Sequence, residues 1–99
     1  MVEILDNAAL HAVMAERPHW EVRDGALVRS VQAPTYAAGI RLVNAVASAA
    51  EKVGHHPDIA IRWTTVTFRL WTHVAGGITK HDAALATTVD DLIDEVLPA

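Results

Sequence analysis

The sequence predicts a two-layer α+β fold in which a four-stranded antiparallel sheet carries three helices on one face. Three segments repeat apolar residues at the spacing of an amphipathic helix, and two regions between them alternate apolar and polar residues around a turn. The predicted order is therefore α-β-β-α-β-β-α. Strands joined by short turns pair in antiparallel fashion, and helices bury the apolar side of such a sheet. We expect residues 1–99 to form one domain, because 99 residues supply a single core.

The first helix is predicted over residues 6–17. Asp6 or Asn7 can cap its N-terminus, and Pro18 prevents its continuation. The apolar residues that share one face of this helix are Leu10, Val13 and Met14.

A β-hairpin follows, with strands predicted over residues 19–23 and 27–33. Asp24-Gly25 is a strong hairpin-turn dipeptide. The second strand mixes apolar and polar residues on both faces, so its alternation selects no inner face. Pro34 ends the strand and suits the first turn of the next helix.

The longest helix is predicted over residues 35–53, and Gly54 is expected to end it. Because much of its apolar stripe is alanine, we expect it to approach another helix or a sheet closely. The stripe consists of Tyr36, Ile40, Val43, Ala47 and Ala50, widened by Leu42 and Val46.

The second pair of strands is predicted over residues 58–72, with a turn near Thr64. The residues expected on the helix-covered face are Val66, Phe68 and Leu70. His73 has the parity of Arg69 and Trp71, so we expect it on the opposite side or at the strand's end. That opposite face must be solvated or paired with another surface, and Trp71 on it favours pairing.

The last helix is predicted to start at Thr79, after a flexible turn at Gly76-Gly77. Thr79 and Asp82 have the spacing of a capping box, with Asp in place of Glu. The predicted buried stripe contains Leu85, Val89, Leu92, Ile93 and Val96.

Composition excludes several classes of protein. The net charge of -4 argues against a protein that binds nucleic acid by neutralising phosphates. No segment approaches the roughly 20 apolar residues of a membrane span, and the acidic N-terminal segment is unlike a secretory signal, so we expect a cytoplasmic protein. The absence of cysteine removes disulfides and thiolate chemistry.

Titratable side chains concentrate at two loop junctions, one after the long helix and one before the last helix. Imidazoles titrate near neutrality, and a neighbouring carboxylate orients an imidazole, so such a group can transfer protons. Six histidines in a chain of 99 residues are a surplus. The members of the cluster are Glu51, His55, His56, Asp58, His73, His81 and Asp82.

Simpler interpretations stand beside this one. The pair His55-His56 before Pro57 is also typical of an exposed turn. Asp82 can be a helix cap and nothing more, and Glu51 a solvated residue of a last helical turn.

Two of the tryptophans and three of the histidines have structural interpretations. Trp20 and Trp63 are most simply core residues, and only secondarily a stacking wall for a flat ligand. We interpret His11, His19 and His81 as surface or core-edge residues.

A metal site is not expected. His55 and His56 are adjacent, and in extended backbone their side chains diverge, so both cannot easily reach one ion. No pair of histidines has the H-x-x-x-H spacing of a helical metal site.

Two sequence blocks carry a family resemblance. The first reads E-x-x-x-H-H-P-D over residues 51–58, and the second reads T-H-x-x-G-G-I-T-x-x-D over residues 72–82. At this separation the blocks form a specific pair. With Trp20 and the segment around Asn44, they extend from about residue 19 to residue 93. The chain thus resembles the pterin-4a-carbinolamine dehydratase family.

The resemblance implies an enzyme that eliminates water from 4a-hydroxytetrahydropterin to give a quinonoid dihydropterin, with no metal, cofactor or covalent intermediate. It also implies the predicted fold and a homo-oligomer, either a dimer or a tetramer. The histidines that it implies for acid–base catalysis and binding are His55, His56 and His73. The residues that it implies for binding or orienting the pterin are Glu51, Asp82, Trp20, Pro57 and Asp58.

Some points stay open. Neither the acid and base among the histidines nor the side chain of the pterin follows from the sequence. Only one of the three positions Val31, Ala33 and Tyr36 is aromatic, where the family commonly has an aromatic series, which puts the shape of the pocket in doubt. A catalytically silent assembly or dimerisation factor of the same fold is the alternative function.

Overall fold

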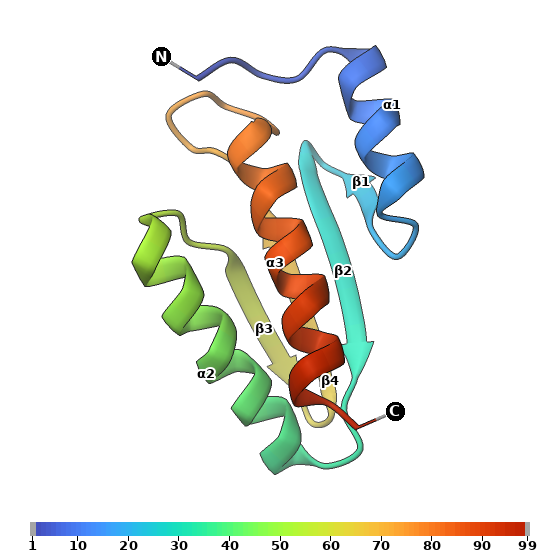
Figure 1. The fold of residues 1–99 in the computed structure, drawn as a ribbon, viewed down its shortest axis with the longest axis vertical. Coiled ribbons are helices and arrows are strands. Elements are labelled where there is room, and N and C mark those ends of the chain that lie inside the picture. Colours follow the sequence, from blue (N-terminus) through green and yellow to red (C-terminus); the bar gives the residue numbers. More distant parts are fainter. Residues whose placement is uncertain (1, 99) are drawn as a thin grey trace.

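A computed structural model describes residues 2–98 and confirms the predicted fold (Figure 1). The sheet is antiparallel throughout, with the strand order β1-β2-β4-β3. Helices α2 and α3 lie side by side across one face, and α1 lies at the β1 end (Figure 1). The elements are α1 (Asn7–Glu16), β1 (Glu21–Arg23), β2 (Ala26–Gln32), α2 (Tyr36–Val53), β3 (Asp58–Arg62), β4 (Thr65–Leu70) and α3 (Lys80–Val96).

Local capping signals define the helix ends. Asp6 accepts a hydrogen bond from the backbone N–H of Ala9, so Asp6 rather than Asn7 is the cap. Thr35 caps α2, which ends at Gly54 with a φ of 65°. A left-handed residue at this place favours glycine, because a side chain there would be strained. The turn that follows carries the His55-His56 pair.

The core lies between the sheet and the two long helices. The predicted inner face of β4 is confirmed, since Val66, Phe68 and Leu70 are all fully buried. In α2 the predicted stripe is partly wrong: its buried side is centred on Leu42 and Val46. The residues of α2 that belong to this buried side are Ala38, Gly39, Leu42, Val46 and Ala50, whereas Tyr36 and Ala47 are exposed.

The face of β2 that packs against the helices contains an arginine, which explains why its alternation was ambiguous. Arg29 lies opposite Phe68 in the sheet, on the inner face, and its guanidinium donates to Asp90 of α3. Asp90 also accepts from the indole nitrogen of Trp20 at 2.8 Å and from Arg17 at 3.3 Å. This cluster ties the first hairpin and the end of α1 to α3.

The two tryptophans interpreted as core residues have different positions. Trp20 is buried, as predicted. The prediction for Trp63 is wrong, since 79% of its surface is exposed in the turn between β3 and β4, where its φ is 53°. Among residues 2–98, no helix combines the length and the apolar character needed to cross a bilayer.

Candidate active site

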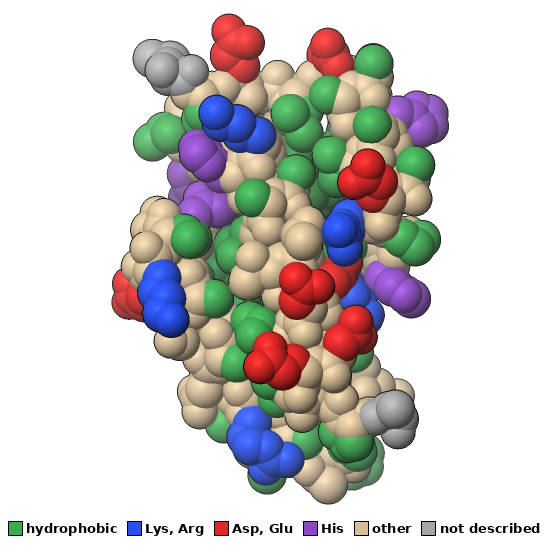
Figure 2. Space-filling view, viewed as in Figure 1, with side chains coloured by type: hydrophobic (Ala, Val, Ile, Leu, Met, Phe, Trp, Pro, Cys, Tyr) green, Lys and Arg blue, Asp and Glu red, His purple; other side chains and the backbone are tan. Residues whose placement is uncertain are grey.

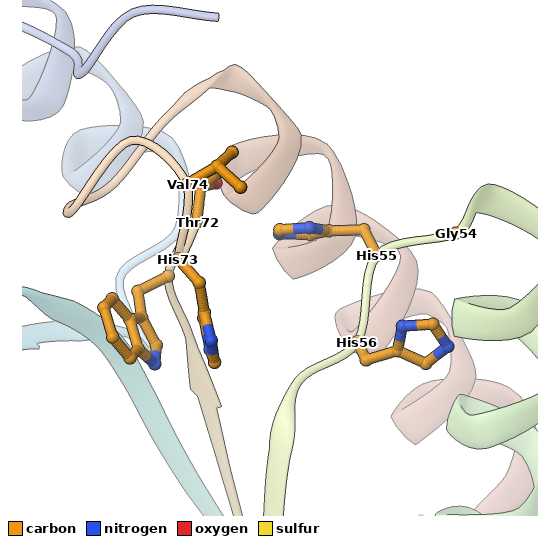
Figure 3. A pocket seen from close by; sticks show the side chains of 7 residues that line it. Gly54, His55, His56, Thr72, His73 and Val74 are labelled. Carbon is orange, nitrogen blue, oxygen red and sulfur yellow. The ribbon is translucent and has the colours of Figure 1, made fainter.

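The two sequence blocks meet at one cavity. His55 and His56 follow the end of α2, and His73 follows β4 on a separate segment across the pocket (Figure 3). The cavity is about 320 Å³, which lies at the lower end of the range for small-molecule sites. Its lining residues are Gly54, His55, His56, Trp71, Thr72, His73 and Val74. Figure 2 shows histidines gathered where the C-terminal end of α2 meets the N-terminal end of α3.

A buried carboxylate holds His55. Nε2 of His55 lies 2.6 Å from Oδ1 of Asp82, whose side chain is fully buried, while 19% of the His55 side chain is exposed. An ionised carboxylate only accepts hydrogen bonds, so Nε2 of His55 carries the proton. In the neutral ring Nδ1 is then the basic nitrogen. The contact thus sets both the orientation and the tautomer of His55.

The other oxygen of Asp82 is held from two sides. Its Oδ2 accepts from the hydroxyl of Thr72 and from the backbone N–H of Thr79, each at 2.8 Å. The hydroxyl of Thr79 lies 2.7 Å from that of Thr72 and completes the network. Since Thr72 uses its proton on Asp82, Thr79 donates to Thr72. Within residues 2–98, no buried side-chain nitrogen or oxygen lacks a partner.

Asp82 therefore combines two functions in one side chain. It closes the capping box with Thr79 at the start of α3, as the spacing predicted. It also supports His55, which lies 27 positions earlier in the chain. The interpretation of Asp82 as a helix cap and nothing more omits this second contact.

His56 has a looser environment than His55. Its Nε2 lies 3.2 Å from Oε2 of Glu51, which belongs to the last turn of α2. The His56 and Glu51 side chains are 61% and 76% exposed, so water screens this pair. The contact therefore orients His56 only weakly.

His73 is held by an aromatic ring. It stacks on Trp71, with ring centroids 4.0 Å apart and planes inclined by 27°. Both side chains leave the chain on the face away from the helices, as the shared parity predicted, while Thr72 between them points to Asp82. The alternation at the end of β4 thus sends the Thr72 hydroxyl to the buried network and the rings of Trp71 and His73 to the opposite side.

Several predicted pterin-binding residues lie outside the pocket lining. Trp20 is in the core with its indole nitrogen on Asp90. Asp58 accepts a hydrogen bond from the indole of Trp71 and so reaches the pocket wall indirectly. Pro57 is half-buried between His56 and β3.

The pocket residues can donate and accept protons around a flat ligand. Three imidazoles line the cavity, and two of them contact carboxylates. Among residues 2–98, no group of three or more histidines and carboxylates is arranged to hold a metal ion. The geometry supports general acid–base chemistry.

Comparison with known proteins identifies the family. The family model for pterin 4 alpha carbinolamine dehydratase matches residues 3–92. The chain belongs to this family. Proteins named "Putative pterin-4-alpha-carbinolamine dehydratase" from Mycolicibacterium smegmatis and Nocardia farcinica are each 47% identical to it. The alignments cover 93% and 91% of this chain, and 98% and 95% of those proteins.

Two solved structures have the same fold. A transcriptional coactivator/pterin dehydratase from Brucella melitensis superposes with a TM-score of 0.87 at 23% identity, over 91% of this chain and 98% of that one. A pterin dehydratase-like protein, described as a RuBisCO assembly factor in the alpha-carboxysome, gives a TM-score of 0.62 at 25% identity. That second alignment covers 76% of this chain and 87% of the other.

In this member of the pterin dehydratase family, the structure adds residues that the sequence interpretation missed. Trp71 and Val74 line the pocket. His81, which the sequence placed in the titratable cluster, lies outside this lining, with its ring 5.9 Å from that of His55. The shared parity of Trp71 and His73 was a usable signal for Trp71.

Proposed function

We propose that the protein eliminates water from 4a-hydroxytetrahydropterin to give a quinonoid dihydropterin, using histidines as general acid and base. The observation that carries the proposal is the meeting of His55, His56 and His73 in one cavity, with His55 held by the buried Asp82. Family membership over residues 3–92 supports the same activity.

The reaction needs two proton transfers. A proton delivered to the C4a hydroxyl allows the C4a–O bond to break, and the oxygen leaves as water. Loss of the proton on N5 lets its electron pair form the C4a=N5 double bond, so no electrons are gained or lost. Imidazoles can supply both transfers near neutral pH.

The contact between His55 and Asp82 favours His55 as the base. A carboxylate beside an imidazole stabilises the imidazolium that forms when the ring accepts a proton. His56 and His73 are more exposed and are the candidates for the acid. Their exchange with solvent would restore the proton that the acid gives up.

A coupled assay tests the proposal. The purified protein should accelerate dehydration of the carbinolamine, followed by ultraviolet absorbance with a pterin-dependent hydroxylase. Replacing His55, His56 and His73 by alanine one at a time should lower the rate by about 100-fold or more for the acid and the base. His19→Ala is the matched control, because His19 is exposed and lies outside the pocket. Equal background rates in the unsubstituted protein and His73→Ala would rule out the proposal.

We also propose that the protein is a homo-oligomer, a dimer or a tetramer. The outward side of α2 supports this, because Tyr36 is 53% exposed and Ala47 is exposed beside half-buried Ile40 and Val43. Apolar side chains on an open helix face favour association of identical chains. A strict monomer in light scattering at micromolar concentration would contradict this part.

A catalytically silent assembly factor is the second candidate. The likeness to the RuBisCO assembly factor supports it, because that protein has the same fold. The three histidines at one cavity favour the enzyme instead. A stoichiometric protein partner in a pull-down, together with an inert coupled assay, would favour the assembly factor.

A further inference from the structure

The three pocket histidines are held in different ways. His55 and His56 each contact a carboxylate through Nε2. Among residues 2–98, no hydrogen bond holds the ring of His73, and its ordered contact is the stack on Trp71 at 4.0 Å. The direction in which His73 presents its nitrogens therefore depends on the indole.

Trp71 is in turn fixed by a polar group on the helix-free face of the sheet. Its indole nitrogen donates to Oδ2 of Asp58 at 3.3 Å, and the guanidinium carbon of Arg69 lies 5.4 Å from its ring centroid. Arg69 lies 3.5 Å from the same Asp58 oxygen and donates to the backbone carbonyl of Asp24 at 3.0 Å. Asp58, Arg69 and Asp24 belong to β3, β4 and the first hairpin turn, so contacts from three parts of the chain fix the position of the indole.

A stack restrains an imidazole without occupying its nitrogens. A hydrogen bond to a carboxylate uses one of the two ring nitrogens, as it does in His55. Stacking covers only one ring face, and leaves Nδ1 and Nε2 of His73 both available to a substrate. His73 is thus restrained in orientation and able to give and accept protons on either nitrogen.

We propose that Trp71 is the positioning residue for His73, supported by Asp58 and Arg69. This inference rests on the proposed dehydratase function. It also gives Asp58 a role that differs from direct pterin binding: Asp58 acts on the site through the indole. The simpler possibility is that Trp71 only shields the sheet, in which case its loss would leave the geometry of His73 unchanged.

Three variants test the proposal: Trp71→Ser removes the ring, Trp71→Phe keeps a ring but loses the N–H, and Trp63→Ser is the matched control. Trp63 is exposed at the opposite end of β4, away from the pocket. The readouts are the Cε1–H signal of His73 in NMR spectra and the dehydration rate. The methyl signals of the core residues packed around the fully buried Phe68 report whether each variant is folded.

In the unsubstituted protein the indole should shift the His73 signal upfield by its ring current. Trp71→Ser should abolish that shift and lower kcat by about two- to tenfold with a smaller change in KM, while Trp71→Phe retains most of both. Trp63→Ser should change neither. An unchanged His73 signal or an unchanged kcat in Trp71→Ser would overturn the proposal.

The two proposals fail in distinguishable ways. If the unsubstituted protein is inert, the proposed function is refuted and the inference of a catalytic positioning role falls with it, although the NMR signal still shows the stack. If the protein is active and Trp71→Ser matches it in either the His73 signal or kcat, the positioning role is refuted and the dehydratase function stands.

Discussion

Replacing Asp82 by asparagine separates its capping function from its support of His55. Asparagine has the same shape, and its amide oxygen can still accept from Thr72 and from the backbone N–H of Thr79, as Oδ2 of Asp82 does at 2.8 Å. The amide cannot turn round, because the backbone N–H of Thr79 only donates. Its NH2 group must therefore face Nε2 of His55, where two donors would meet. His55 has to move its proton to Nδ1 to relieve this contact.

The effect of Asp82→Asn on stability and its effect on kcat can be estimated separately. A hydrogen bond to a charged group contributes about 1.5–3 kcal/mol, and a neutral one about 0.5–1.5 kcal/mol. Two bonds kept but neutralised therefore cost about 2–3 kcal/mol in the free energy of unfolding, or roughly 10–20 °C in melting temperature for a domain of this size. The wrong tautomer removes the basic nitrogen of His55, so we expect kcat to fall by about 100-fold or more.

Thermal melts, the coupled assay and long-range nitrogen–proton spectra of the imidazole measure stability, rate and tautomer in turn. Asp91→Asn is the matched control, because Asp91 is an exposed carboxylate of the same helix. If Asp82→Asn lowers the melting temperature as expected and leaves kcat within about twofold of the unsubstituted protein, the reasoning about His55 is refuted. Asp82 would then be a helix cap alone.

Three further predictions follow from the same geometry. Glu51→Gln should lower kcat by less than about fivefold, because the contact between Glu51 and His56 is exposed and contributes at most about 1 kcal/mol. A larger fall of kcat in the coupled assay would contradict the conclusion that Glu51 orients His56 only weakly. Asp90→Ala leaves the largely buried Arg29 without its carboxylate partner. Chemical denaturation should therefore show that the free energy of unfolding falls by about 3–5 kcal/mol, while kcat of the folded fraction stays unchanged. Trp63→Asn should raise the melting temperature by about 2–4 °C, since asparagine tolerates a positive φ and the exposed indole has little packing to lose; a lower melting temperature would show that Trp63 is packed.

Much of the fold was predictable because its signals are local. Asp6 and Thr79 cap helices through hydrogen bonds that span two or three residues, and Gly54 ends α2 within one turn. The alternation of β4 identified its buried face for a similar reason, since neighbouring residues of a strand point to opposite sides. The same alternation placed Trp71 and His73 together.

Two positions could not be predicted from the sequence, because each depends on strand pairing or on a partner far away in the chain. Arg29 lies on the inner face of β2 because Asp90 of α3, 61 positions later, neutralises it there. Trp63 follows the pattern of a core residue but sits in a turn, because the strand register ends one position before it. Neither outcome is visible in a local window.

By itself, the sequence determined the order of the elements, several of the residues that begin or end them and the types of side chain that the site contains. Only the tertiary structure decided how those side chains are paired. His55 meets Asp82 and Trp71 meets Asp58 because antiparallel strand pairing and helix packing bring distant loops to one end of the sheet. Hydrogen bonds within a turn depend on a few consecutive residues, whereas contacts across the sheet depend on the packing of the whole chain.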